Sequence, residues 1–152
     1  MWRTLVIAVV LAATTTAVHA GRRRIVVLDF EGPKADKFHD VVERTVRKVN
    51  TTIATEKWNR TADDLRISAP TERDVRKISK RLKLDGVVTG VVRQRDGYYV
   101  LTLRLREGAS GVAVLGPVEI PVGDTHLTSS ERRAVKEFVA SIDEVLSSAG
   151  DN

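Results

Sequence analysis

Carboxylates beside two apolar runs are the first residues that could do chemistry. Asp29 and Glu31 follow the run 25–28, and Asp85 precedes the run 87–92. Two carboxylates can share acid–base work only if both reach the same substrate. If the two runs are parallel strands, Asp29 and Asp85 lie at opposite ends of the sheet. The spacing argues against a catalytic pair and leaves Asp29 alone at the carboxyl end, where α/β sheets often bind ligands.

Other reactive side chains are even less suggestive. His39 and His126 lack the spacing of metal ligands. Ser129 and Ser130 lack the sharp glycine-flanked turn of a hydrolase nucleophile and fit a helix start instead. The sequence has no cysteine, which excludes disulfides, thiolate metal sites and cysteine nucleophiles. We therefore expect no catalytic residue, no cofactor and no metal.

Cations gather on one predicted helix. Arg73, Arg76 and Lys80 lie there together with Lys77 and Lys83. Such a face could bind an anionic glycan or a lipid surface, or it could simply be solvated. The net charge of +5 would also permit nucleic acid, but aromatic residues for base stacking make up only 5% of the chain. We expect no nucleic-acid partner.

The hydrophobic pattern predicts an α/β domain with the order β-α-β-(α)-α-β-β-β-α. The runs 24–30 and 87–92 are apolar on both faces, which is typical of central, parallel strands. The further predicted strands are 51–58, 99–106 and 112–122, and the predicted helices are 36–49, 71–83 and 129–147, with a turn or short helix at 62–65. We expect one shared core, formed by Val27, Leu28, Val42, Val46, Ile78, Leu82, Val88, Leu101, Leu103, Phe138 and Ile142. Helix 36–49 is expected to add Val49 to its buried stripe.

Two of the predicted strands are candidates for a docking edge. Pro117 and Pro121 remove hydrogen-bond donors from strand 112–122, which blunts that edge. Strand 51–58 has no proline and is rich in β-branched residues. Thr55 and Trp58 are therefore candidate partner contacts on this strand, although packing in the core is the favoured interpretation of Trp58 itself.

The amino-terminal segment has the pattern of an export signal. Arg3 precedes an apolar run at 5–13, and Val18 and Ala20 are the small residues that a signal peptidase reads. We expect cleavage after Ala20, which leaves residues 21–152 as a single periplasmic or secreted domain with no membrane span. An uncleaved anchor is the alternative, but the apolar run is shorter than the roughly 20 residues that a bilayer span needs.

Three segments carry a resemblance to a known family. The segments 25–32 (IVVLDFEG), 78–90 (ISKRLKLDGVVTG) and 99–108 (YVLTLRLREG) resemble the TolB amino-terminal-like domain, which the curli secretion protein CsgG and related cell-envelope proteins share. The resemblance implies a mixed five-stranded sheet in the order 2-1-3-4-5 and a non-enzymatic role in envelope assembly or protein contacts. The chain has neither the β-propeller that follows this domain in TolB nor the pore-forming hairpins of CsgG, so those activities do not carry over.

Together these patterns predict an exported, non-enzymatic module that binds or assembles components of the cell envelope. The expected partner is a cell-envelope protein, with an anionic glycan or lipid surface as a second option. The alternative function is a small ligand-binding protein or hydrolase that uses Asp29 at the carboxyl end of the sheet.

Overall fold

A computed structural model describes residues 21–150, so the predicted export signal lies outside the described residues. Five strands and four helices follow one another in the predicted order. The strands are β1 (Arg24–Val27), β2 (Thr51–Ile53), β3 (Gly86–Arg95), β4 (Tyr98–Glu107) and β5 (Ala113–Val122). The helices are α1 (Ala35–Val49), α2 (Thr55–Asp64), α3 (Glu72–Leu82) and α4 (Ser129–Ala149).

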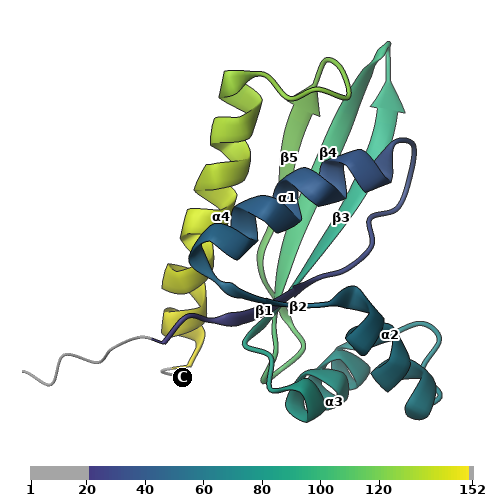
Figure 1. The fold of residues 1–152 in the computed structure, drawn as a ribbon, viewed down its shortest axis with the longest axis vertical. Coiled ribbons are helices and arrows are strands. Elements are labelled where there is room, and N and C mark those ends of the chain that lie inside the picture. Colours follow the sequence, from purple (N-terminus) through teal and green to yellow (C-terminus); the bar gives the residue numbers. More distant parts are fainter. Residues whose placement is uncertain (1–20, 151–152) are drawn as a thin grey trace, which may run out of the picture.

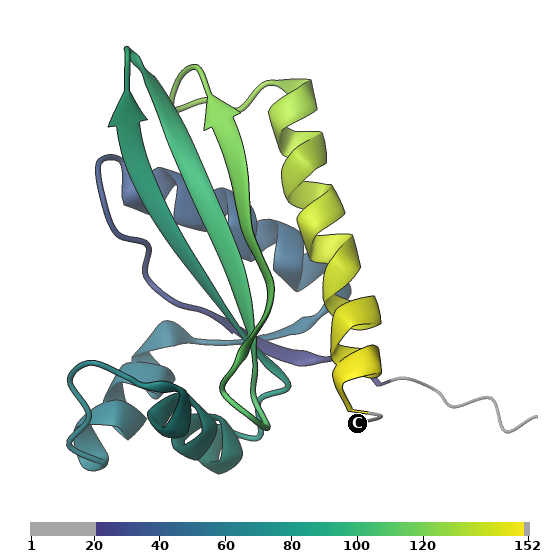
Figure 2. The same ribbon diagram turned by 180° about the vertical axis from the view of Figure 1, so that it is seen from behind.

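The strands form one mixed sheet in the order β2-β1-β3-β4-β5, as expected. β1 pairs in parallel with β2 and β3, while β3, β4 and β5 are antiparallel to one another. Asp96 and Gly97 connect β3 to β4 and both have positive φ angles, as a tight hairpin turn requires. Helices α1 and α4 cover one face of the sheet (Figure 1). Helices α2 and α3 lie on the opposite face, beside the short strands β1 and β2 and the start of β3 (Figure 2).

The larger core lies between the sheet and the pair α1 and α4. Leu101, Leu103 and Leu105 alternate along β4 and are fully buried, which confirms the predicted alternation of its two faces. Gly90 on β3 leaves room for Phe30, because a β-carbon at this glycine would lie only 2.6 Å from the Phe30 ring. The ring thus fills the position that a side chain on β3 would occupy.

A second, smaller core lies on the other face, beneath α2 and α3. It contains Val26, Trp58, Ile78 and Val87, with Leu28 and Leu82 at its margin. The prediction of one shared core is wrong in this respect, because the sheet separates Ile78 from residues such as Leu103. Val26 and Val27 are neighbours on β1 but point to opposite faces, and each contributes to a different core.

The predicted strand 51–58 is wrong beyond Ile53. Thr55 begins α2 instead, and its hydroxyl donates a hydrogen bond to the Val27 carbonyl (2.9 Å). Trp58 follows one turn later and is only 3% exposed, because this face of α2 packs on the sheet. The edge strand is therefore three residues long, and neither Thr55 nor Trp58 lies on a docking edge.

Two smaller differences concern the first strand and the first helix. The first strand was predicted at 24–30, but its regular pairing ends at Val27. Beyond it, an isolated bridge pairs Glu31 with Val91 of β3. Val49, expected in the buried stripe of α1, is 50% exposed. It occupies the last position of the helix, where the chain already turns toward β2.

Helices α3 and α4 each begin with a capping box. Thr71 and Asp74 form the box at α3, and Thr128 and Glu131 form the box at α4. Hydrogen bonds from the Thr71 hydroxyl and backbone N–H hold the pKa of Asp74 below its ordinary value.

Within residues 21–150, no helix combines the length and the apolar character needed to span a membrane.

Candidate functional site

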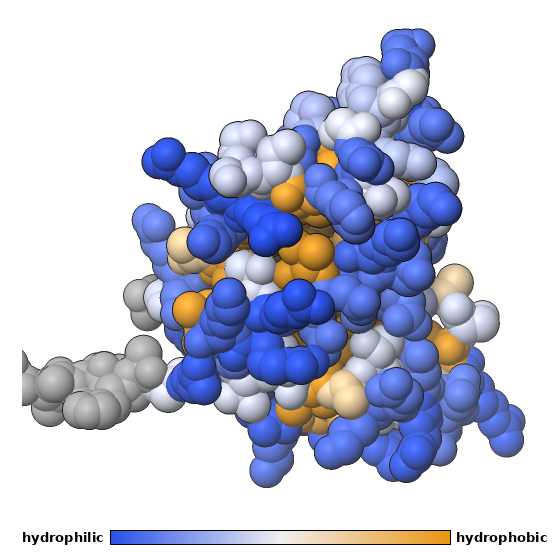
Figure 3. Space-filling model, turned by 45° about the horizontal axis from the view of Figure 1, so that its top comes forward, coloured by the Kyte–Doolittle hydropathy of each residue, from blue (hydrophilic) through white to orange (hydrophobic). Residues whose placement is uncertain are grey.

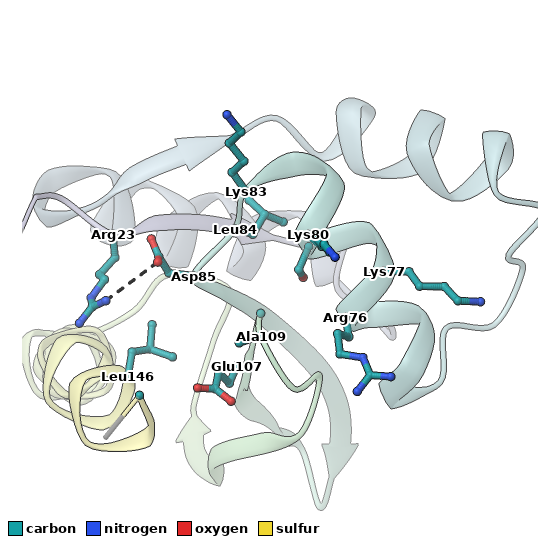
Figure 4. A pocket seen from close by; sticks show the side chains of 13 residues that line it. Arg23, Arg76, Lys77, Lys80, Lys83, Leu84, Asp85, Glu107, Ala109 and Leu146 are labelled. Atoms are coloured by element: carbon teal, nitrogen blue, oxygen red, sulfur yellow. Dashed lines mark ion pairs between the residues drawn. The ribbon is translucent and has the colours of Figure 1, made fainter. Parts of the chain in front are cut away.

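A cavity of about 710 Å³ opens at the end of the sheet where β1 and β3 begin. We call it the basic cavity. One wall is the second half of α3, with Arg76 and Lys80. Arg23 and Leu146 lie on the opposite side, and the turn between β4 and β5 closes it with Ala109 (Figure 4). Residues from four separate parts of the chain therefore converge on one site.

The position of α3 is fixed at both of its ends. The capping box at Thr71 satisfies its first turn. At the other end, the Arg24 guanidinium donates to the carbonyls of Leu82 (3.2 Å) and Lys83 (3.0 Å). Because the last carbonyls of a helix lack partners within it, these contacts stabilise the end that carries the cavity wall.

The turn between β4 and β5 approaches α3 so closely that only glycine fits at two positions. A β-carbon at Gly108 would lie 2.1 Å from the Leu84 carbonyl oxygen, and one at Gly111 would lie 1.9 Å from that of Glu72. Gly108 also donates its N–H to the Asp85 carbonyl (2.8 Å). The turn that closes the cavity is therefore held in close contact with the segment that forms its wall.

The charge around the basic cavity is strongly positive. Five cations line it: Arg23, Arg76, Lys77, Lys80 and Lys83. Its two carboxylates are already engaged, because Asp85 pairs with Arg23 (3.9 Å) and Glu107 accepts a hydrogen bond from Ser110. Arg76, Lys80 and Lys83 make no ion pair with any residue in the range 21–150. The arrangement favours an anionic ligand group.

Three consecutive arginines hold helix ends near this cavity. Arg22 donates to the Lys48 carbonyl at the end of α1 (2.6 Å), and Arg24 binds the end of α3. Arg23 reaches α4, where it donates to the Ser147 hydroxyl (2.9 Å) and lies 3.7 Å from Asp143. These three arginines were not identified from the sequence, because their contacts with three helices arise only in the folded domain.

A second cavity, of about 510 Å³, lies at the opposite end of β1 and contains Asp29. Its lining also includes Glu31, Trp58, Asn59 and Thr89. Asp85 lies at the other end of the sheet, where its carboxylate accepts the Arg24 backbone N–H (2.7 Å). The parallel pairing of β1 with β3 therefore separates Asp29 from Asp85, as the sequence predicted.

The predicted contact residues are distributed over different parts of the molecule. Arg76 and Lys80 line the basic cavity, whereas Arg73, on the same helix, does not. Thr55 and Trp58 belong to α2, nearer the cavity that holds Asp29. Ala109 and Leu146 were not identified from the sequence, because small and apolar residues carry no signal of binding by themselves.

His39 is held by contacts within the fold, whereas His126 is exposed. The Nε2 atom of His39 lies 3.2 Å from the Val27 carbonyl oxygen, and its ring packs edge-on against Phe30. Among the residues that the structure describes, no group of three or more His, Cys, Asp or Glu side chains is arranged to hold a metal ion.

No protein-family model matches the sequence, and no curated protein matches it either. Solved structures with a similar fold do exist. The C-terminal domain of LpoB from Salmonella enterica aligns with a TM-score of 0.54 and 12% identity over 71% of this chain and 88% of that domain. TolB from Acinetobacter baumannii aligns with a TM-score of 0.52 and 14% identity over 84% of this chain and 30% of TolB. The hypothetical protein CT253 from Chlamydia trachomatis gives a TM-score of 0.56 and 8% identity over 84% and 99% of the two chains. At these identities the likeness shows the fold alone.

Proposed function

We propose that residues 21–152 form an exported, non-enzymatic module that binds or assembles a protein partner in the cell envelope. The sequence resemblance to the TolB amino-terminal-like and CsgG-related domains supports this role, as does the fold shared with TolB and with the LpoB C-terminal domain. The proposal assigns no catalytic residue and no cofactor. It places the mature protein in the periplasm or outside the cell.

The basic cavity is the observation that carries the proposal. Arg76, Lys80 and Lys83 leave their charges unneutralised by described residues around a recess with an apolar floor at Leu84 and Leu146. A carboxylate on a partner, flanked by an apolar side chain, complements both features. Hydrogen bonds to charged groups contribute about 1.5 to 3 kcal/mol each, so two such contacts suffice to fix the orientation of the partner.

Export is proposed from the sequence pattern of residues 1–20. Arg22 already binds the Lys48 carbonyl, only one residue after the proposed new amino terminus at Gly21. Cleavage after Ala20 would remove residues that precede this contact and leave all three arginines in the mature domain.

In-cell crosslinking at Ala109 tests the proposal directly. Ala109 is exposed and lines the basic cavity, so a photoreactive amino acid at this position will contact whatever occupies it. Gln94 is the matched control, because it is exposed on β3 near the hairpin at the far end of the sheet. We expect a discrete protein adduct from the probe at Ala109 and none of the same mass from the probe at Gln94.

Either of two results would count against the module. Equal adducts from both positions would mean that the cavity has no special role. Adducts with lipid or glycan, but with no protein, would contradict a protein partner. Mass spectrometry of the purified adduct distinguishes these cases and shows whether the trapped protein belongs to the envelope.

A second candidate function rests on the cavity around Asp29. It lies at the carboxyl ends of β1 and β2, from which α1 and α2 lead to opposite faces of the sheet, a location at which open α/β sheets commonly bind ligands. A small-ligand protein or a hydrolase would use Asp29 there. Turnover of any substrate in a broad screen, abolished by Asp29→Ala, would favour this candidate over the binding module. We expect no turnover.

A further inference from the structure

A groove of about 220 Å³ between α1 and α4 is lined by cations from both helices. We call it the interhelical groove. Arg44 and Lys48 come from α1, and Arg132 and Lys136 come from α4. Val41 and Thr45 complete the lining, and no carboxylate of a described residue contributes to it. The groove lies on the face opposite α2 and α3 and is distinct from the basic cavity.

The cations of the groove differ from their neighbours on the same two helices. On α1, Arg47 pairs with Glu43 four residues earlier, at 2.6 Å. On α4, Arg133 pairs with Glu137 four residues later, at 3.1 Å. None of the four groove cations makes an ion pair with a residue between 21 and 150. On each helix the cation next to the groove residues in sequence is therefore paired, whereas the four cations that line the groove are not paired with any described residue.

This arrangement has an electrostatic cost. Arg44 and Lys48 are four residues apart, as are Arg132 and Lys136, so each pair places like charges on one side of its helix. Like charges at this spacing destabilise a helix, and here two such pairs also face each other across a narrow groove. An anion bound between them would convert this repulsion into attraction.

The groove is partly organised before any ligand binds. The Nε of Arg132 donates to the Leu127 carbonyl (3.0 Å), which fixes the guanidinium and leaves its outer nitrogens to bind a ligand. The Thr45 hydroxyl donates to the Val41 carbonyl (2.8 Å) and can still accept a hydrogen bond. A restrained arginine loses less conformational freedom when it binds an oxyanion.

From these observations we propose that the interhelical groove binds a phosphate group. Four cations around a small space suit a compact anion that carries nearly two negative charges, and arginine binds phosphate oxygens with two parallel hydrogen bonds. A singly charged carboxylate would leave most of this charge unbalanced. Figure 3 shows this side of the molecule, with strongly hydrophilic residues beside apolar patches. Val41 is the one apolar residue among the described residues that line the groove, so the site offers a partner protein little apolar surface to bury.

Calorimetry with inorganic phosphate, at constant ionic strength set by sodium chloride, measures binding to the purified residues 21–152. We expect saturable binding to one site. Arg44→Gln and Lys136→Gln should each weaken it at least tenfold, because each removes a charged hydrogen-bond donor. Arg47→Gln and Arg133→Gln are the matched controls on the same helices and should change the affinity less than twofold.

Vesicles of phosphatidic acid in phosphatidylcholine form a second arm with the same variants. Binding to these vesicles that is lost in Arg44→Gln and kept in Arg47→Gln identifies the phosphate of a lipid as the source. Binding of inorganic phosphate without vesicle binding identifies a small phosphorylated molecule. No binding in either arm, or equal losses in groove and control variants, overturns the proposal.

The repulsion supplies an independent readout that needs no ligand. Without phosphate, Lys136→Gln should raise the Tm by about 1 to 2 °C, because one of the facing like charges is removed. With saturating phosphate, the order should reverse, since the unchanged protein binds the anion at least tenfold more tightly and is therefore stabilised more than the variant. A Tm of Lys136→Gln that stays above that of the unchanged protein in saturating phosphate would contradict the site.

Discussion

Truncation of Leu103 to alanine should be among the most damaging changes to the larger core. Leu103 is fully buried at the centre of β4, opposite Gly90 on one side and Val118 on the other. The substitution removes three carbon atoms, which costs about 2.4 kcal/mol at ~0.8 kcal/mol per buried methylene. Backbone pairing on both sides prevents β4 from collapsing into the void, so a cavity term of about 1 to 2 kcal/mol adds to it.

Urea unfolding followed by circular dichroism measures this loss. For an m-value of about 1.5 kcal/mol/M, a loss of ~3.5 to 4.5 kcal/mol lowers the midpoint by roughly 2.5 M. Val49→Ala is the control, because Val49 is 50% exposed and should change the free energy of unfolding by less than about 0.5 kcal/mol. If Leu103→Ala costs no more than Val49→Ala at an unchanged m-value, the assignment of the two faces of β4 is wrong.

Three further predictions concern the amino terminus, a buried hydroxyl and the helix caps. Protein recovered from the envelope fraction should have an intact mass that begins at Gly21, whereas a mass that includes residues 1–20 would indicate an anchor. Ser79→Ala should leave the Tm unchanged or raise it, because the Ser79 hydroxyl is buried and has no hydrogen-bond partner among the described residues; a drop of several degrees would contradict this. The lowered pKa of Asp74 means that its contribution to stability is complete above the unfolded pKa and is lost as the pH falls through the folded value. The Tm should therefore fall below about pH 4, and it should fall less in Asp74→Asn. An equal acid dependence in both proteins would exclude this role.

The central sheet was predictable because its signals are local. The runs around Val26 and Val88 are apolar on both faces, which only an interior strand tolerates, and both strands are interior and parallel. Pro117 and Pro121 correctly predicted an edge, because each removes a donor from the ladder. Alternation along β4 correctly separated its buried leucines from its polar face.

Only the end of helix α2 was predicted, as a turn or short helix at 62–65, because two local preferences conflict where the helix begins. Thr51, Thr52 and Ile53 are β-branched and do form a strand, and Thr55 continues the same composition. The chain changes to a helix because Trp58, Thr61 and Ala62 share one face of a helix and are buried together against the sheet. The stabilisation from burying this face is a tertiary effect, which the strand propensities of the individual residues do not reflect.

The candidate sites were only partly predictable. Arg76 and Lys80 were identified because they repeat on one helix. Arg23 and Leu146 were not, because they are far apart in the sequence and meet at the basic cavity only in the folded domain. The interhelical groove has the same origin, since each helix alone shows an ordinary mixture of charges. The cluster of four unpaired cations forms only when α1 and α4 pack against each other.

Charge reversal at the basic cavity tests the central claim most directly. With the photoreactive residue at Ala109, the yield of the protein adduct should fall at least tenfold in Lys80→Glu, because the variant replaces an attractive charge with a repulsive one. Arg93→Glu is the control, since Arg93 is exposed on β3 away from the cavity, and its adduct yield should match that of the unchanged protein. An undiminished yield in Lys80→Glu, at equal protein level and with an unchanged fold, would contradict the binding role of the cavity.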